Sequence, residues 1–374
     1  MIGKNSRIAI IGGGLSGLYS AYLLEQHGFS HYQIFEARDR LGGRIAALTV
    51  EALSDDGAAV EDSRSRFDLG PTWYWPQMQP AFAQLIAELG LGSFAQYDQG
   101  DMLFERSQSN PPVQMPGYRN ELLTLRLAGG MSALIDALQE KIPADKICYQ
   151  QQVQAIVLVD GEITLQLAAG ALAQFDQVII AAPPRLIASN VEFQPKLPEP
   201  VQHAWLATET WMAPHAKFLA VFPRAFWREQ GLSGSARSNI GPMVEIHDAS
   251  LPSGKAALFG FIGFPAQARR MLGAAQLQQQ CQAQLQRLFG PLAAMPEGFA
   301  LKDWALDPLT ATAADVTGQG AHPQPPSHLV ADGPWQHKLF GAGSEWSKNY
   351  PGYLAGCIEA AEQAVGQMLK MGST

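Results

Sequence analysis

The chain has 374 residues, enough for two or three domains at about 150 residues each. Hydrophobic residues make up 47% and charged residues 16%, which excludes a disordered, collagen-like or coiled-coil protein. The net charge of −8 argues against a nucleic acid held by general electrostatics. Glycine is in excess, because 36 glycines in 374 residues exceed the usual share of about 7%.

The first 36 residues predict a strand, a glycine-rich turn, a helix and a second strand. The apolar run Arg7–Ile11 reads as a buried strand, and a helical pattern follows the turn until Gly28 can end it. A second strand is expected at Tyr32–Phe35. This order of elements is typical of a dinucleotide-binding unit.

Three glycines of the turn match the dinucleotide fingerprint in spacing. Gly12 permits the tight turn, Gly14 lets a pyrophosphate approach the backbone, and Gly17 lets the helix pack on the strand. Glu36 ends the second strand, where a carboxylate can accept hydrogen bonds from ribose hydroxyls. The alternative is a glycine-rich turn of an unrelated α/β protein, and the strand-turn-helix-strand setting disfavours it.

Further elements follow in chain order. Helices are expected at Pro80–Leu89, Met131–Lys141, Met271–Phe289 and Tyr353–Leu369. Strands are expected within Val153–Phe175 and at Asp176–Ala182, Lys217–Phe222, Ala256–Phe264 and Leu339–Phe340. At Pro183 and Pro184 we expect the chain to cross into a second domain.

The spacing of the cysteines and the length of the apolar runs indicate where in the cell the protein is located. Cys148, Cys281 and Cys357 lack the spacing of a zinc site or a disulfide framework, and the histidines form no ligand cluster. Gly12 interrupts the first apolar run before it could form a secretory core, and no run approaches the ~20 residues that cross a bilayer. We expect a cytoplasmic protein without metal or membrane.

A set of ordered blocks resembles the flavin-containing amine oxidase family, which includes monoamine, polyamine and L-amino acid oxidases. The resemblance spans most of the chain. Its blocks are Glu36–Arg44, Asp68–Trp73, Gly129–Met131, Val178–Pro184, Lys217–Phe222 with Phe226–Arg228, Trp304, Leu339–Glu345 and Gly352–Gly356.

The resemblance implies an α/β fold with a Rossmann-type FAD-binding domain and an inserted, mixed-sheet α+β substrate domain. The FAD-binding domain would comprise residues 1–78, 122–186 and 308–374. The substrate domain would comprise residues 79–121 and 187–307.

It also implies a set of FAD-binding residues. For the adenosine and pyrophosphate end they are Gly12, Gly14, Leu15, Ser16, Gly17, Glu36, Ala37, Arg38, Gly43, Arg44 and Val153; the remainder are Gly70, Pro71, Thr72, Trp73, Gly343, Glu345, Gly352, Tyr353 and Leu354. The start of the last helix would stabilise the negative charge of reduced flavin. Gly341, Gly343, Gly352 and Gly356 are expected to leave room for the cofactor, although an ordinary capped helix is the simpler alternative.

Lys217, Tyr353 and Trp73 are the expected catalytic residues. Lys217 lies in an apolar strand, where an ammonium is costly without a partner, and a lysine at this place in the family holds a water against flavin N5. Tyr353 and Trp73 would be aromatic walls. The alternatives are a surface lysine on an edge strand and two rings that only pack.

The sequence departs from the family in two places. Ala313 stands where monoamine oxidases carry the cysteine that tethers the flavin, so we expect non-covalent FAD. Ala314 replaces a tyrosine, which removes half of the paired aromatic cage. The segment between Trp73 and Gly129 lacks the long helical insertion that roofs the cavity of the relatives.

The expected function is oxidation of a small amine by hydride transfer to flavin N5. The imine would be released, and O2 would reoxidise the flavin to give H2O2. One alternative is oxidation of a carbon–carbon bond, as in protoporphyrinogen oxidases and carotenoid desaturases. The other is a non-catalytic FAD-binding partner or assembly protein.

Overall fold

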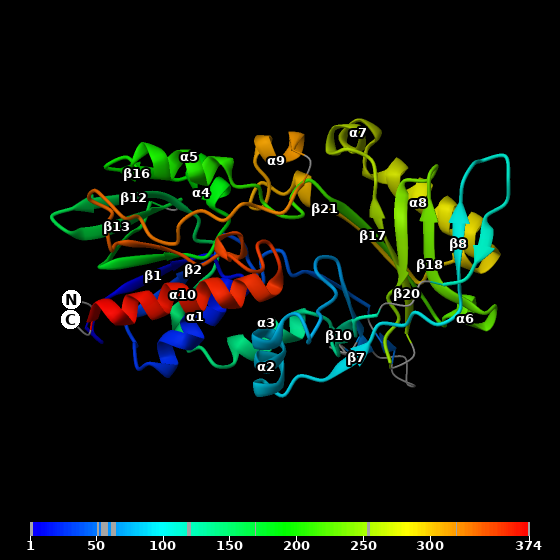
Figure 1. Ribbon diagram of the computed structural model, residues 1–374, viewed down its shortest axis with the longest axis horizontal. Helices are drawn as coiled ribbons and strands as arrows, with labels where there is room; N and C mark the ends of the chain where they lie inside the picture. The colour runs from blue at the N-terminus through cyan, green and yellow to red at the C-terminus, as the bar shows by residue number, and fades with distance from the viewer. Residues whose placement is uncertain are drawn as a thin grey trace. The chain divides into compact units, whose positions relative to one another are not determined.

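A computed structural model describes residues 3–50, 52–53, 59–60, 65–117, 121–168, 170–252, 255–318 and 320–372. The chain forms two compact units, which Figure 1 traces by residue colour. The first unit comprises Met1–Arg44, Leu134–Ala213 and Asp307–Thr374, and the second comprises Ile45–Ala133 and Pro214–Leu306. These ranges differ from the expected domain boundaries mainly at residues 45–78, 122–133 and 187–213, and the roles assigned to the two domains stay predictions.

The first unit is built on a parallel five-stranded sheet. Its order is β11-β2-β1-β15-β22, with β11 at Ile147–Cys148, β2 at Tyr32–Phe35, β1 at Ile8–Ile11, β15 at Gln177–Ile180 and β22 at Leu339–Gly341. The central strands are apolar throughout because helices cover such sheets on both faces. Two of these helices, α1 at Leu15–Gln26 and α10 at Leu354–Gly372, lie side by side.

A second sheet and several short helices complete this unit. The sheet has the order β14-β13-β12-β16, with strands at Leu172–Phe175, Glu162–Leu167, Val153–Val159 and Glu192–Gln194. The helices are α4 at Pro184–Asn190, α5 at Glu199–Ala207 and α9 at Ala313–Thr317, and α3 at Ser132–Gln139 runs into this unit from the other. Pro184 begins α4, and the chain leaves the unit only after Ala213.

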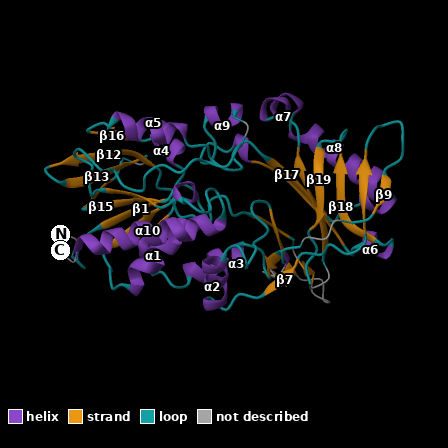
Figure 2. Cartoon of the chain, viewed as in Figure 1, coloured by secondary structure: helices purple, strands orange, loops and turns teal. Residues whose placement is uncertain are grey.

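The second unit contains a seven-stranded mixed sheet, drawn in orange in Figure 2. Its order is β21-β17-β20-β19-β18-β8-β9, at Gly298–Asp303, Ala216–Phe222, Ala256–Ile262, Met243–Asp248, Leu232–Ser238, Asp101–Glu105 and Val113–Met115. Neighbours are antiparallel except β18 and β8. Two-stranded pairs join β3 (Ala47–Thr49) to β6 (Arg66–Asp68), β4 (Ala52–Leu53) to β5 (Ala59–Val60), and β7 (Ser93–Ala95) to β10 (Leu125–Leu127).

The two faces of strand β17 pack on different clusters. Phe218, Ala220 and Phe222 contact the core that also contains residues of α8 (Ala274–Phe289), whereas Leu219 and Val221 belong to a cluster on the opposite face. Lys217 lies on the same face of β17 as Leu219 and Val221. The other helices of the unit are α2 at Pro80–Glu88, α6 at Phe226–Glu229 and α7 at Ala266–Leu272.

One expected helix is two helices. The sequence predicted a single helix over Met271–Phe289, but α7 ends at Leu272 and α8 begins at Ala274. Gly273 between them has a φ of +82°, which is left-handed backbone that breaks a helix. Of the described helices, none is both long and apolar enough to cross a membrane.

Candidate functional site

The turn after β1 is closed by contacts that only glycine permits. Gly12 has a φ of +106°, and a Cβ there would lie 2.7 Å from the carbonyl oxygen of Ala181. A Cβ on Gly17 would lie 1.9 Å from the carbonyl oxygen of Gly12. The first turn of α1 therefore rests directly on the backbone that leaves the sheet.

The other side of this turn is open. A Cβ on Gly14 would meet only the carbonyl oxygen of Gly42, at 3.9 Å. Helix α1 begins here without a side-chain cap and without an acidic residue in its first turn. Helix N–H groups and the positive end of the helix dipole are thus available to an anion such as a pyrophosphate.

Glu36 and Arg38 lie at the end of β2, beside the same turn. The buried Glu36 carboxylate accepts hydrogen bonds from the backbone N–H groups of Gly13 and Arg38, both at 2.8 Å. The Arg38 guanidinium donates to Asp307 at 3.1 Å and to Thr310 at 3.0 Å, while its Nε is buried with no hydrogen-bond partner in the described structure. A fixed carboxylate with spare lone pairs and an unpaired buried donor fit the polar adenosine end of FAD.

Arg44 and Glu345 tie the N-terminal and C-terminal segments of the first unit together. Glu345 is fully buried, and both of its carboxylate oxygens accept from the Arg44 guanidinium, one of them at 3.1 Å. Arg44 also donates to the carbonyl oxygen of Trp211 at 3.2 Å. This bidentate pair joins the short 3-10 helix Ser344–Trp346 to the segment whose Gly42 pairs with the glycine turn.

The glycines of the C-terminal block do not leave the room that we expected for a cofactor. A Cβ on Gly341 would lie 2.3 Å from the ring of Trp346, and one on Gly356 would lie 2.1 Å from the carbonyl oxygen of Tyr350. A Cβ on Gly352 would lie 2.5 Å from Trp211. These glycines make space for the protein's own tryptophans and backbone.

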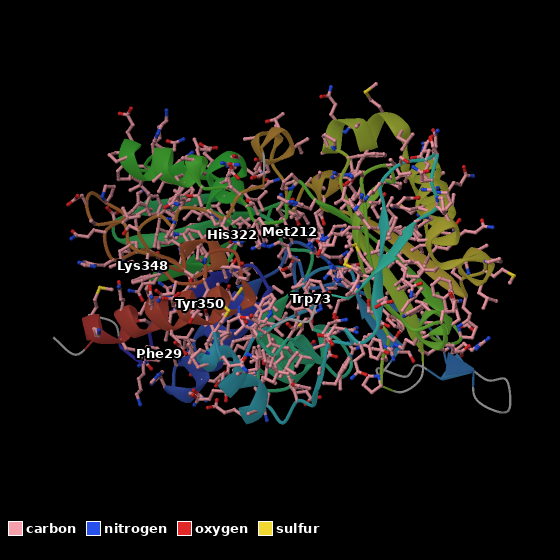
Figure 3. All side chains as sticks on the ribbon, turned by 45° about the vertical axis from the view of Figure 1, so that its right-hand side comes forward. Phe29, Trp73, Met212, His322, Lys348 and Tyr350 are labelled. Atoms are coloured by element: carbon pink, nitrogen blue, oxygen red, sulfur yellow. The ribbon has the colours of Figure 1, made fainter. Side chains whose placement is uncertain are left out.

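Tyr353 forms part of an aromatic stack. His322 lies between Trp211 and Tyr353, with ring centroids 3.9 Å and 4.7 Å apart and planes tilted by 21° and 16°. His322 Nδ1 is 3.0 Å from the carbonyl oxygen of Pro351, and Figure 3 labels this histidine. Although Ala314 removes the expected second ring, a loop residue supplies a partner for Tyr353.

In the second unit, Lys217 is held within the sheet rather than on its surface. Only 3% of the residue is exposed, and its Nζ donates to Thr72 Oγ1 at 2.7 Å and to the carbonyl oxygen of Gly70 at 3.2 Å. The ammonium lies 3.9 Å from the ring centroid of Phe259, a favourable cation–π distance. The alternative of a surface lysine is wrong.

Buried charges surround Lys217. Burial lowers the pKa of Lys217 to about 7, against the opposing effect of the Asp68 carboxylate, and burial raises the pKa of Asp68. Asp68 accepts from the backbone N–H of Met131 at 2.8 Å. Arg126 is also buried and donates to the carbonyl oxygens of Ala249 and Ser250, both at 2.9 Å. Lys217 can therefore hold a neutral amine near physiological pH.

Trp73 lies among aromatic rings of the sheet. Its ring centroid is 4.9 Å from that of His247, 5.4 Å from that of Phe259 and 6.5 Å from that of Phe261. Its indole N–H donates to Gln96 at 2.7 Å. Trp73, labelled in Figure 3, thus forms an aromatic surface together with strands β19 and β20.

The structure groups the expected residues within each unit. In the first unit, Gly12, Gly14, Leu15, Ser16, Gly17, Glu36, Ala37, Arg38, Gly43, Arg44, Gly343, Glu345, Gly352, Tyr353 and Leu354 lie in the turn, at the end of β2 or at the start of α10, and Val153 begins β12. In the second, Gly70, Pro71, Thr72 and Trp73 share one segment that contacts Lys217. Their roles stay predictions.

Several residues of these sites were missed by sequence reasoning. They are Asp68, Arg126, Trp211, His322 and His247. Asp68 was part of a recognised block and had a signal, because a carboxylate in an apolar segment needs a partner. The others reach their sites only through tertiary contacts. No group of three metal-ligating side chains occurs in the part of the chain that the structure describes.

The family follows from comparison with known proteins. The family model for flavin containing amine oxidoreductases matches residues 99–369, and a model for an NAD(P)-binding Rossmann-like domain matches residues 10–89. The chain belongs to the flavin-containing amine oxidoreductase family. A probable flavin-containing monoamine oxidase A of Dictyostelium discoideum is 22% identical, over 94% of this chain and 95% of its own.

Solved structures share the fold. A putrescine oxidase bound to putrescine has a TM-score of 0.77 and 19% identity, covering 98% of this chain and 99% of its own. Cyclohexylamine oxidase from Brevibacterium oxydans IH-35A has a TM-score of 0.78 and 18% identity, covering 99% of this chain and all of its own. This flavin amine oxidoreductase therefore has the expected two-part α/β architecture, is an oxidoreductase, and uses FAD.

Replacing Gly17 by Ala is expected to lower the melting temperature and the FAD content together. The added methyl would collide with the Gly12 carbonyl, which is backbone and cannot move aside as a flexible side chain could. Gly366→Ala is the control, because Gly366 lies in α10 with nothing within 4 Å of its Cβ position, and alanine there should gain up to ~1 kcal/mol of stability. A Gly17→Ala protein with normal melting temperature and FAD content would contradict this account.

Lys217 is expected to titrate near pH 7. Its pKa is lowered to about 7, so the neutral amine predominates above that pH and the ammonium below it. NMR of the protein with 13C-labelled lysine should show one side-chain resonance with this midpoint, and Lys217→Met should remove it. If no lysine resonance has a midpoint near pH 7, the burial argument for Lys217 is wrong.

Proposed function

We propose that this protein oxidises a small primary or secondary amine at the carbon that bears the nitrogen. A hydride leaves that carbon for N5 of FAD, the imine is released and hydrolysed, and O2 takes up the two electrons to form H2O2. The balanced outcome for a primary amine is conversion of amine, O2 and water into carbonyl compound, ammonia and H2O2.

FAD supplies the two-electron acceptor for this reaction, and the first unit supplies its binding residues. The start of α1 would hold the pyrophosphate, Glu36 would accept from the ribose, and Arg38 Nε would find its missing acceptor. Ala313 has no side-chain group that could bond to the flavin. We therefore propose that the cofactor is held non-covalently.

The buried amine of Lys217 is the observation that carries the proposal. Removal of hydride requires an uncharged substrate nitrogen, and a lysine that is itself neutral near pH 7 does not repel or protonate the substrate. Its hydrogen bond to Thr72 fixes its direction. Lys217 would orient a water, and Trp73 of the same unit would be an aromatic wall that excludes other water. Tyr353 stays a predicted aromatic wall of the first unit.

The two alternatives receive less support. Oxidation of a carbon–carbon bond has no need of a neutral lysine. A non-catalytic FAD-binding partner was suggested by Ala314, which removes one ring of the aromatic pair, but His322 gives Tyr353 a stacked partner. Likeness to amine oxidases over nearly the whole chain favours amine oxidation.

Mixing the yellow holoprotein anaerobically with amines is expected to bleach its flavin. The panel should hold primary monoamines, diamines and amino acids, and acid precipitation should release the flavin into the supernatant for quantification. Admission of O2 should restore the colour with one H2O2 per flavin reduced. If no amine bleaches a fully loaded protein, the proposed activity is wrong; flavin in the acid pellet would refute non-covalent binding.

Lys217→Met is expected to slow bleaching or reoxidation at least ~100-fold while FAD remains bound. Methionine fills a similar volume without the buried amine, so the fold should persist. Lys255→Met is the control, because Lys255 pairs with Glu297 in the same unit. Rates measured by stopped-flow absorbance that match those of the control would remove the role assigned to Lys217.

A further inference from the structure

Two cations and one carboxylate are buried near one another in the second unit. Lys217 of β17, Asp68 of β6 and Arg126 of β10 are each at most 4% exposed. Asp68 acts electrostatically on both cations, and Arg126 acts on Lys217. One negative charge does not balance two positive charges, so full ionisation of all three would leave a buried positive charge. Because an arginine does not lose its proton in proteins, Lys217 is the cation that can become neutral.

The segment from Asp68 to Thr72 provides both the carboxylate and the hydrogen-bond acceptors of Lys217. The Lys217 Nζ donates to the carbonyl oxygen of Gly70 at 3.2 Å and to Thr72 Oγ1 at 2.7 Å. Both acceptors are uncharged, and a neutral amine can donate to them as an ammonium does. Asp68 is fixed by the backbone N–H of Met131 at 2.8 Å. The loss of a proton from Lys217 therefore leaves its hydrogen bonds in place.

Arg126 is held rigidly by groups that carry no negative charge. Its guanidinium donates to the carbonyl oxygens of Ser250 and Ala249, both at 2.9 Å, and lies 5.0 Å from the ring centroid of Phe94. Its Nε is buried with no hydrogen-bond partner in the described structure. These contacts fix the position of the guanidinium, but they do not neutralise its charge, so Arg126 competes with Lys217 for the negative charge of Asp68.

Other charged groups surround the three residues. Asp248 and Arg228 both act on Arg126 and form a salt bridge with each other at 2.8 Å. The remaining groups are Arg66, which acts on Asp68; Lys302, directly opposite Lys217 on β21; and Glu245 and His247 on β19, which pair with residues of β20 that lie opposite Lys217 and Leu219. Substitution of Asp68 or Arg126 leaves all of these side chains in the protein, so a comparison of variants reports on the substituted charge.

We infer that Arg126 keeps Lys217 uncharged by competing with it for the Asp68 carboxylate. Arg126 is thus a positioning residue that acts through Asp68 and Lys217 and does not touch the substrate. The consequence for catalysis rests on the proposed function, in which the amine is oxidised beside a neutral Lys217. Burial is the main cause that lowers the pKa of Lys217; Arg126 lowers it further, and Asp68 opposes both effects.

The test follows Lys217 by NMR of holoprotein labelled with 13C-lysine. Arg126→Gln keeps an amide donor and removes the positive charge, so the midpoint near pH 7 should rise by about one to two pH units. Asp68→Asn keeps the acceptor for Met131 and removes the negative charge, so the midpoint should fall. Arg270→Gln is the control, because Arg270 is an exposed arginine of α7 in the same unit, and it should leave the midpoint unchanged.

The directions of the two shifts separate an effect of charge from an effect of packing. Loosened packing would hydrate Lys217 in either variant and raise its midpoint toward that of a lysine in water. A rise in both variants, or no shift in either one, overturns the inference. If Asp68→Asn does not fold, Arg126→Gln decides alone: a rise at the melting temperature of wild type supports the inference, and any other result overturns it.

Anaerobic bleaching of the flavin by an amine gives a second readout. Arg126→Gln should be bleached about fivefold to fiftyfold more slowly than wild type at pH 7, and at nearly the same rate at pH 10, where Lys217 is neutral in both proteins. The substrate ionises identically in the two experiments, so a constant ratio of rates across pH overturns the role of Arg126 while amine oxidation stands. If the NMR midpoints shift as expected but no amine bleaches wild type, the proposed function fails and the control of Lys217 by Arg126 stands.

Discussion

The close contact between Gly17 and the carbonyl of Gly12 sets the geometry of the first unit. Because neither residue carries a Cβ at the point of contact, α1 begins directly over the end of β1. Helix α10 then packs along α1, and the pair Arg44 and Glu345 joins the short 3-10 helix Ser344–Trp346 to the segment whose Gly42 pairs with Gly14. The start of α1, a fixed carboxylate and an open backbone surface thus lie together in the first unit, where we propose that the extended anionic cofactor binds.

The second unit depends on a different constraint, the burial of three charges that come from β17, β6 and β10, strands of three different sheets. Lys217, Asp68 and Arg126 are each almost fully buried, and such charges are tolerated only when hydrogen bonds and opposite charges compensate them. Thr72 and the backbone of Gly70 satisfy Lys217, and backbone carbonyls satisfy Arg126. Burial still lowers the pKa of Lys217, so this lysine loses its proton more easily than a lysine in water. The arrangement therefore affects the chemistry of Lys217 and is not a gain in stability.

The features that the sequence predicted well are those that depend on residues close together in the chain. Gly12, Gly14 and Gly17 act through their own backbone and their immediate neighbours, so their spacing alone indicates the turn, and apolar runs indicate strands such as β1 and β15. Gly273 also carried a local signal, but the helical pattern of the residues that follow it concealed the break between α7 and α8.

The remaining features needed the fold, because they join residues that are distant in sequence. Arg126 reaches the region of Lys217 through the pairing of β10 and its hydrogen bonds to residues 249 and 250. Lys217 and Glu245 both lie directly opposite Phe261, and this depends on the register in which β17 and β19 pair with β20. Neither the composition nor the spacing of residues along the chain predicts that register. A shift of the pairing by one residue would move every side chain of the strand to the other face.

The aromatic stack shows why substrate selectivity does not transfer residue by residue from monoamine oxidases. Stacking requires a planar ring at a suitable distance, not a fixed position in the sequence. With alanine at position 314, the ring beside Tyr353 comes from His322, and Trp211 closes the other side. An imidazole held at its Nδ1 by the carbonyl of Pro351 presents a smaller and more polar surface than a phenol. Replacement of the expected tyrosine by Ala314 therefore leaves an imidazole, and not an empty space, beside Tyr353.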